Sequence, residues 1–79
     1  MKITYDPEAD ALYIILREVV PSDSTDVEEG VTVELDGQGH IVAIEILDAS
    51  ERMTAEELTN ITYENLLLTA EPEEAKASP

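Results

Sequence analysis

Two segments of this chain, residues 2–17 and 29–47, each have the pattern of a β-hairpin, and this pair most constrains the fold. In the second segment, residues 31–36 alternate between apolar and polar side chains, which is typical of a strand with one buried face. The turn after it, Asp36-Gly37-Gln38-Gly39, holds glycines that supply the positive φ of a tight turn. We therefore expect an antiparallel sheet at the centre of the fold.

The same rules assign the rest of the chain. Strands are predicted at residues 2–5, 11–16, 31–36 and 41–47, with a turn at residues 6–10 and a loop at residues 18–26. Thr54 and Glu57 are spaced as a capping box, which predicts the start of a short helix. Residues 60–68 mix strand-favouring residues with a run of leucines that favours helix, and we favour a fifth strand there.

These elements predict an α+β fold. It is a small, mainly antiparallel β-meander of four to five strands with one short C-terminal helix, formed by residues 1–69 as a single domain. Residues 70–79 lack aromatic and β-branched side chains and carry several charges, so we expect a disordered acidic tail there.

Two of the expected strands carry apolar side chains on both faces of the sheet. On one of them, Leu12 and Ile14 point one way while Tyr13 and Ile15 point the other, because side chains alternate along a strand. One short helix covers one face, so we expect a second copy to cover the other face or to pair with an edge strand. The alternative is that the C-terminal segment folds back and covers that face alone. The expected interface residues are Tyr13, Ile15, Ile41, Ala43 and Leu47.

The small size and the composition restrict the function. The chain has 79 residues and no cysteine, so neither disulfides nor thiolate metal sites stabilise it, and a partner subunit is the remaining common support for a small core. It carries 19 Asp and Glu against 4 Lys and Arg, a net charge of -15. Such a charge argues against binding nucleic acid or anionic membranes. It favours either a basic partner or simple solubility.

The sequence has no run of about 20 apolar residues that would span a membrane. Acidic residues follow the first methionine closely, which argues against a signal peptide. We therefore expect a cytoplasmic protein.

The acidic first turn, Asp6, Glu8 and Asp10, is the weak candidate for a site that binds a divalent cation or a small ligand. The glycine and glutamate that an EF-hand loop needs are missing, because Ala11 and Arg17 stand at those positions. The alternative is structural: Asp6 caps the turn and Asp10 holds the start of the next strand.

The other polar residues give no catalytic set. A second acidic group consists of Asp26, Glu28 and Glu29. If it lay close to the first turn, the like charges would raise one another's pKa values. The alternative is that these side chains are solvated. His40 is the only histidine and follows a turn glycine, so we expect it to be exposed. We expect no catalytic residues, no metal site of the usual kind and no cofactor, and thus not an enzyme.

Three segments resemble a known family. They are residues 5–14 (YDPEADALYI), 30–36 (GVTVELD) and 39–50 (GHIVAIEILDAS). They are similar to the segments of a family of small bacterial proteins, the domain of unknown function 2283, over about residues 2–53. The resemblance implies a small, soluble, mainly β domain of prokaryotic type, and it implies no activity and no catalytic residue.

Three functions remain open at this point. The first is a non-enzymatic interaction module that self-associates as a dimer or a higher homo-oligomer. The second is an acidic regulator, similar to an antitoxin or a nucleic-acid mimic, that docks on a basic protein. The third is a binder of a small ligand or a divalent cation through the acidic first turn.

Overall fold

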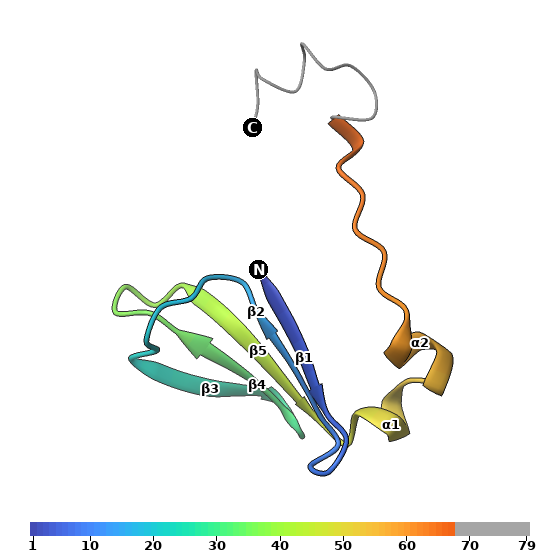
Figure 1. The fold of residues 1–79 in the computed structure, drawn as a ribbon. Helices are drawn as coiled ribbons and strands as arrows, with labels where there is room; N and C mark the ends of the chain where they lie inside the picture. Colours follow the sequence, from blue (N-terminus) through green and yellow to red (C-terminus); the bar gives the residue numbers. More distant parts are fainter. Residues whose placement is uncertain (68–79) are drawn as a thin grey trace.

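The computed structural model describes residues 1–67, which form one five-stranded antiparallel sheet followed by two short helices (Figure 1). The strands are β1 (Lys2–Asp6), β2 (Ala11–Ile15), β3 (Asp23–Glu28), β4 (Val31–Leu35) and β5 (Ile41–Leu47), and the helices are α1 (Ala49–Arg52) and α2 (Ala55–Thr59). The predicted α+β class is confirmed. The tail predicted at residues 70–79 lies outside the described residues.

The two predicted hairpins lie side by side in the sheet. The strand order is β1-β2-β5-β4-β3, and every neighbouring pair is antiparallel. The first hairpin joins β1 to β2 and the second joins β4 to β5, as expected from the turn sequences. Strand β5 pairs with β2, so the two hairpins meet at the centre of the sheet.

Strand β3 corrects the loop that the sequence predicts at residues 18–26. Its six residues, Asp-Ser-Thr-Asp-Val-Glu, lack the alternating apolar pattern of a half-buried strand, and all six are exposed. Pairing with β4 holds the strand in place, for example through Thr25 opposite Val33. A register shift between Asp26 and Glu28 interrupts this pairing near the turn into β4. Backbone hydrogen bonding to a neighbour, rather than side-chain burial, makes this segment a strand.

The fifth strand favoured at residues 60–68 is wrong for the residues that the structure describes. Residues 60–65 belong to no helix or strand, and a helical turn begins at residues 66–67. After α2, Ile61 lies over β1 and β2 and Tyr63 lies near Met1 and Ile3, but no described residue of this segment pairs with a strand of the sheet. The described part also holds one helix more than expected, the single turn α1.

The pairing register sorts the side chains onto two faces, since residues opposite each other in neighbouring strands point the same way. One row across the sheet is Ile3, Ile14, Ile44, Val33 and Thr25. A parallel row begins Tyr5, Leu12, Ile46 and Val31. We call the side that holds these two rows the apolar face.

The other side of the sheet, the mixed face, alternates apolar and charged residues. Its rows are Thr4, Tyr13, Glu45, Thr32 and Asp26, and next to it Lys2, Ile15, Ala43, Glu34 and Ser24. The predicted two-sided character of β2 and β5 is thus confirmed. The second side, however, carries carboxylates from β4 and β5.

A β-bulge in β5 places Ile41 on a different face of the sheet from the one predicted. The register between β4 and β5 shifts so that Leu35 lies opposite Ile41, while Glu34 lies opposite Ala43. Leu35 belongs to the apolar side because it is next to Glu34 in its strand, and Ile41 lies opposite it. The alternation that places Ile41 with Ala43 and Leu47 is therefore wrong, because the extra residue, Val42, interrupts it.

Candidate interaction surface

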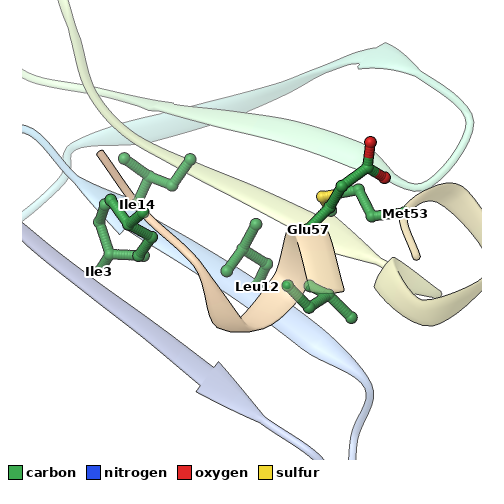
Figure 2. Close-up of a pocket in the computed structure, with 7 residues that line it drawn as sticks. Ile3, Leu12, Ile14, Met53 and Glu57 are labelled. Atoms are coloured by element: carbon green, nitrogen blue, oxygen red, sulfur yellow. The ribbon is translucent and has the colours of Figure 1, made fainter. Parts of the chain in front are cut away.

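Helix α2 lies over β1 and β2 on one half of the apolar face, where Ile3 is still exposed and Leu12 and Ile14 are half-buried. Its start is fixed by the predicted capping box: the Thr54 hydroxyl accepts a hydrogen bond from the Glu57 backbone N–H at 3.1 Å, and the Glu57 carboxylate accepts one from the Thr54 N–H at 2.9 Å. A cavity of about 120 Å³ lies beneath the helix (Figure 2). Its lining is Ile3, Leu12, Ile14, Met53, Glu57, Leu58 and Ile61.

The short helix α1 sets where α2 lies. Asp48, just before α1, has a positive φ of 55°, which turns the chain sharply at the end of β5. The Ala49 N–H then donates to the Asp10 carbonyl oxygen at 3.0 Å. Ala49 is fully buried, with 0% of its surface exposed, so its small side chain allows this close approach to the first turn.

The other half of the apolar face has no described element over it. We call it the open half, and it consists of Val31, Val33 and Leu35 of β4 with Ile44 and Ile46 of β5. Of these five residues only Val33 is buried, and the other four are half-buried. Within residues 1–67 the buried side chains are those of Val33, Val42, Ala43 and Ala49. A five-stranded sheet with so little buried apolar surface is unusual for a stable small domain.

Helix length explains why half of the face is open. Five helical residues extend about 7.5 Å, whereas five strands spaced at about 4.8 Å make a sheet roughly 20 Å wide. Because one helix was expected to cover this face, Val31, Val33, Ile44 and Ile46 were not among the predicted contact residues. The shortness of the segment that follows the capping box was the signal that could have found them.

Four of the five predicted interface residues share the mixed face: Tyr13, Ile15, Ala43 and Leu47. Ala43 is buried within the sheet. The Tyr13 hydroxyl donates a hydrogen bond to the Glu34 carboxylate. This hydrogen bond, and then the partial burial of the side chain, raise the pKa of Tyr13. Glu45 also lies opposite Tyr13. This side thus has a polar pair at its centre, whereas the apolar face holds charged residues only on its edge strand β3, where Asp23 and Glu28 lie opposite Leu35 and Val31.

Three large apolar side chains after α2 are strongly exposed. Ile61, Tyr63 and Leu66 have exposed fractions of 64%, 79% and 69%. We call residues 60–67 the arm. It leaves α2 with an extended backbone at Asn60 (φ -123°, ψ 123°).

The acidic first turn has a structural role for two of its three carboxylates. Asp6 accepts hydrogen bonds from the backbone N–H groups of Glu8 and Ala9 at 2.9 and 3.3 Å. Asp10, with a φ of 54°, accepts from the Tyr5 hydroxyl at 2.6 Å and from the Ser50 N–H and hydroxyl at 3.0 and 2.7 Å. These bonds, first that from Tyr5, lower the pKa of Asp10. Asp10 thereby joins the first turn to α1.

The second acidic group is divided among different partners. Asp26 accepts from the Thr32 hydroxyl at 2.9 Å, and Glu28 forms an ion pair with Arg52 at 2.6 Å. Arg52 also donates to the carbonyl oxygens of Glu29 and Leu47. The pairing of this group with the first turn, one of the two outcomes considered above, is not what the structure shows.

The hairpin turn at residues 36–39 is organised by Asp36. Its carboxylate accepts from the backbone N–H groups of His40 and Gln38, both at 2.9 Å, and from Arg17 at 3.1 Å, and these bonds lower its pKa. His40 itself is exposed, as expected. Across residues 1–67, no three His, Asp or Glu side chains lie close enough to hold a metal ion.

The helices of the described region are too short or too polar to cross a membrane.

Comparison with known proteins is consistent with this picture of a small sheet without an assigned site. No curated protein and no solved structure matches the chain. A family model, described as a protein of unknown function (DUF2283), matches residues 2–50. The match spans all five strands and the first residues of α1. The chain therefore belongs to the family of proteins of unknown function DUF2283.

Proposed function

We propose that this protein is a non-enzymatic interaction module that self-associates, with a second copy covering the open half of its apolar face. The observation that carries the proposal is that Ile44 and Ile46 of the central strand β5, and Val31 and Leu35 of its neighbour β4, are only half-buried. A second copy supplies the apolar cover that α2 is too short to provide.

The energetic argument concerns the size of the domain. Fully burying a Val, Leu or Ile side chain contributes about 1.5–3 kcal/mol relative to leaving it exposed. A small domain has only about 5–15 kcal/mol of net stability, so leaving half of this face in water forfeits a large share. Association has its own entropic cost, yet two copies cover two such faces at once.

The use of the polar residues supports the non-enzymatic part of the proposal. Asp6, Asp10 and Asp36 accept hydrogen bonds from backbone N–H groups or from side chains that link elements of the fold. Ser50 donates a hydrogen bond from its hydroxyl to Asp10, whose lowered pKa makes this carboxylate a weak base for activating a nucleophile. These groups support turns and helix starts.

Size-exclusion chromatography with light scattering, from low to high micromolar concentration, tests the proposal. We expect a dimer or larger assembly, and we expect the double variant Val31→Thr/Ile44→Thr on the open half to shift it towards the monomer. The matched control, Thr32→Ser/Glu45→Gln, changes neighbouring positions on the mixed face and should leave the assembly intact. A wild-type chain that stays at the monomer mass of 8.7 kDa at every concentration overturns the proposal.

A further inference from the structure

We infer that, in the self-associated form proposed above, the arm of each copy lies across the open half of the other copy's apolar face. This inference rests on the proposed self-association and adds which part of the second copy makes the contact. It follows from the exposure of the arm, its direction, its charge and its length, which are independent observations.

The arm is apolar where a solvated linker would be polar. Ile61 and Tyr63 alternate with Thr62 and Glu64, so in an extended chain the two large side chains point to the same side. Both are more exposed than any large apolar residue on the apolar face. A Tyr side chain buries about 150–250 Å² when it is covered, so this segment has a large area to gain.

The arm does not cover its own open half. Ile61 contributes to the cavity beneath α2, over β1 and β2, on the covered half of the face. Further along, Tyr63 lines an open hollow of about 500 Å³ with Met1 and Ile3, so it lies beside the β1 edge of its own sheet. The chain then continues away from the sheet, on the side of β1 (Figure 1). Strands β1 and β2 separate it from β5 and β4 in the sheet order.

Charge selects the open half as the contact between two copies. The whole chain carries -15, so most surfaces of one copy repel those of another. On β1, β2, β4 and β5, the apolar-face positions hold no charged residue, and the carboxylates of this face, Asp23 and Glu28, lie on the edge strand β3 opposite Leu35 and Val31. The arm has one, Glu64, among its eight residues. The arm and the β4–β5 part of the open half thus hold fewer carboxylates than the rest of the molecule, and they meet with less electrostatic repulsion than other pairs of surfaces.

The lengths also agree. Ile61 lies over β1 and β2 of its own copy, so residues 62–67 remain for the contact. Six residues span at most about 20 Å when extended, and the seven residues of β5 span about 23 Å. One arm is therefore long enough to run along most of the open half. A two-fold symmetric exchange, in which each copy gives and receives one arm, covers both open halves and leaves no arm or open half exposed.

Substitution of exposed arm residues tests the contact without touching the cavity beneath α2. We expect Tyr63→Ser/Leu66→Ser to weaken dimerisation by at least about tenfold in light-scattering titrations, with an unchanged circular dichroism spectrum. Thr62→Ala, in the same arm, should behave as the wild type. If the wild type dimerises and the double variant dimerises equally well, the arm exchange is wrong while the proposed self-association stands. A wild-type monomer overturns both.

Cross-linking between differently labelled copies identifies the contact itself. The chain has no cysteine, so introduced cysteines are unique. We expect a Tyr63→Cys chain mixed with a Val31→Cys chain to form a hetero-dimer with a short bismaleimide. The control is Thr32→Cys, one residue away on the mixed face, which should react far less with Tyr63→Cys. Equal reaction with both positions, or cross-links only within a Tyr63→Cys/Val31→Cys chain, overturns the exchange.

Discussion

Arg52 joins three parts of the chain that are distant in sequence. Its guanidinium donates to the Leu47 carbonyl at the end of β5, to the Glu29 carbonyl in the β3–β4 turn and to the Glu28 carboxylate. The planar fork of an arginine suits such a set, whereas lysine offers a single point of contact. Gly30 leaves room for it, because a Cβ atom built there would lie 2.8 Å from an Arg52 nitrogen.

The close approach of Arg52 to Gly30 predicts that the losses of stability caused by Gly30→Ala and Arg52→Ala are not additive. Gly30→Ala should destabilise by more than the roughly 1–2 kcal/mol of a left-handed backbone, because the new methyl group also displaces Arg52. Gly39→Ala is the matched control, since Gly39 has a similar φ of 85° and no atom within 4 Å of its Cβ position. Urea unfolding should show that Arg52→Ala removes most of the difference between the two variants. Equal losses at Gly30 and Gly39 in the wild-type background contradict the steric account.

The titrating groups with hydrogen-bonded partners predict how stability varies with pH. Hydrogen bonds from Tyr5 and Ser50 lower the pKa of Asp10, and hydrogen bonds from His40 and Gln38 lower the pKa of Asp36. The stability that these two carboxylates contribute is therefore present above their ordinary pKa of 3.8 and is lost as the pH falls through the lowered values. Hydrogen bonds to carboxylates raise the pKa of Tyr5 and Tyr13. The stability that these two hydroxyls contribute is therefore present below their ordinary pKa of 10.0 and is lost as the pH rises through the raised values.

We therefore expect the melting temperature to be highest between about pH 5 and 9 and to fall on both sides. Asp10→Asn should flatten the acid side, because asparagine tolerates the φ of 54° at this position but does not titrate. Calorimetry from pH 2 to 11 measures this. An acid limb of unchanged slope in the variant would show that Asp10 is not one of the groups responsible.

Among the elements, those fixed by local chemistry were predictable from the sequence. The glycine turn at residues 36–39 and the capping box at Thr54 both specify their structure within four residues, and both are present. Strand β3 and helix α1 were missed because other parts of the chain hold them: β4 supplies the backbone partners of β3, and Asp10 receives the first N–H of α1.

The segment at residues 60–67 was misassigned for a related reason. Its composition suits a strand, but a strand requires backbone pairing with an edge, and residues 60–65 pair with neither edge although Ile61 and Tyr63 lie near β1. The candidate surface was predictable only as far as two apolar sides on β2 and β5. Which side α2 covers depends on the strand register and on the length of the helix. Neither can be read from a short sequence pattern.

The capping box predicts how much α2 depends on its first turn. A helix of five residues has almost no stability alone, so loss of the cap should fray it and uncover Leu58. Thr54→Ala should reduce the free energy of unfolding by about 1 kcal/mol. Thr62→Ala deletes the same atoms at an exposed position outside the helix and should have a smaller effect. Equal effects in urea unfolding would mean that α2 is held by packing alone.

For the whole molecule, the balance between charge and apolar surface sets the response to salt. Two copies of charge -15 repel each other, and this repulsion is screened as the ionic strength rises. The apolar contact itself is insensitive to screening. The self-associated form should therefore be favoured by salt, in contrast to an acidic regulator bound to a basic protein, which salt dissociates.

We expect the apparent dissociation constant of the dimer to fall when sodium chloride rises from about 0.02 to 0.5 M, where the Debye length shortens from roughly 20 Å to under 5 Å. Sedimentation velocity at several protein concentrations measures it. Sodium sulfate matched for ionic strength distinguishes screening from a general salting-out effect. A dimer that dissociates as salt is added would point to charged contacts instead of the open half.

Strand β3 has a consequence for the size of any assembly. It is one of the two edges of the sheet, and it places Asp23, Asp26 and Glu28 in a row of six exposed residues. A second copy that tried to extend the sheet through this edge would bring carboxylates against carboxylates, at a position where backbone pairing would otherwise be open-ended. Growth into fibres is thus discouraged along this edge, while the proposed contact through the apolar face ends once two copies have covered each other.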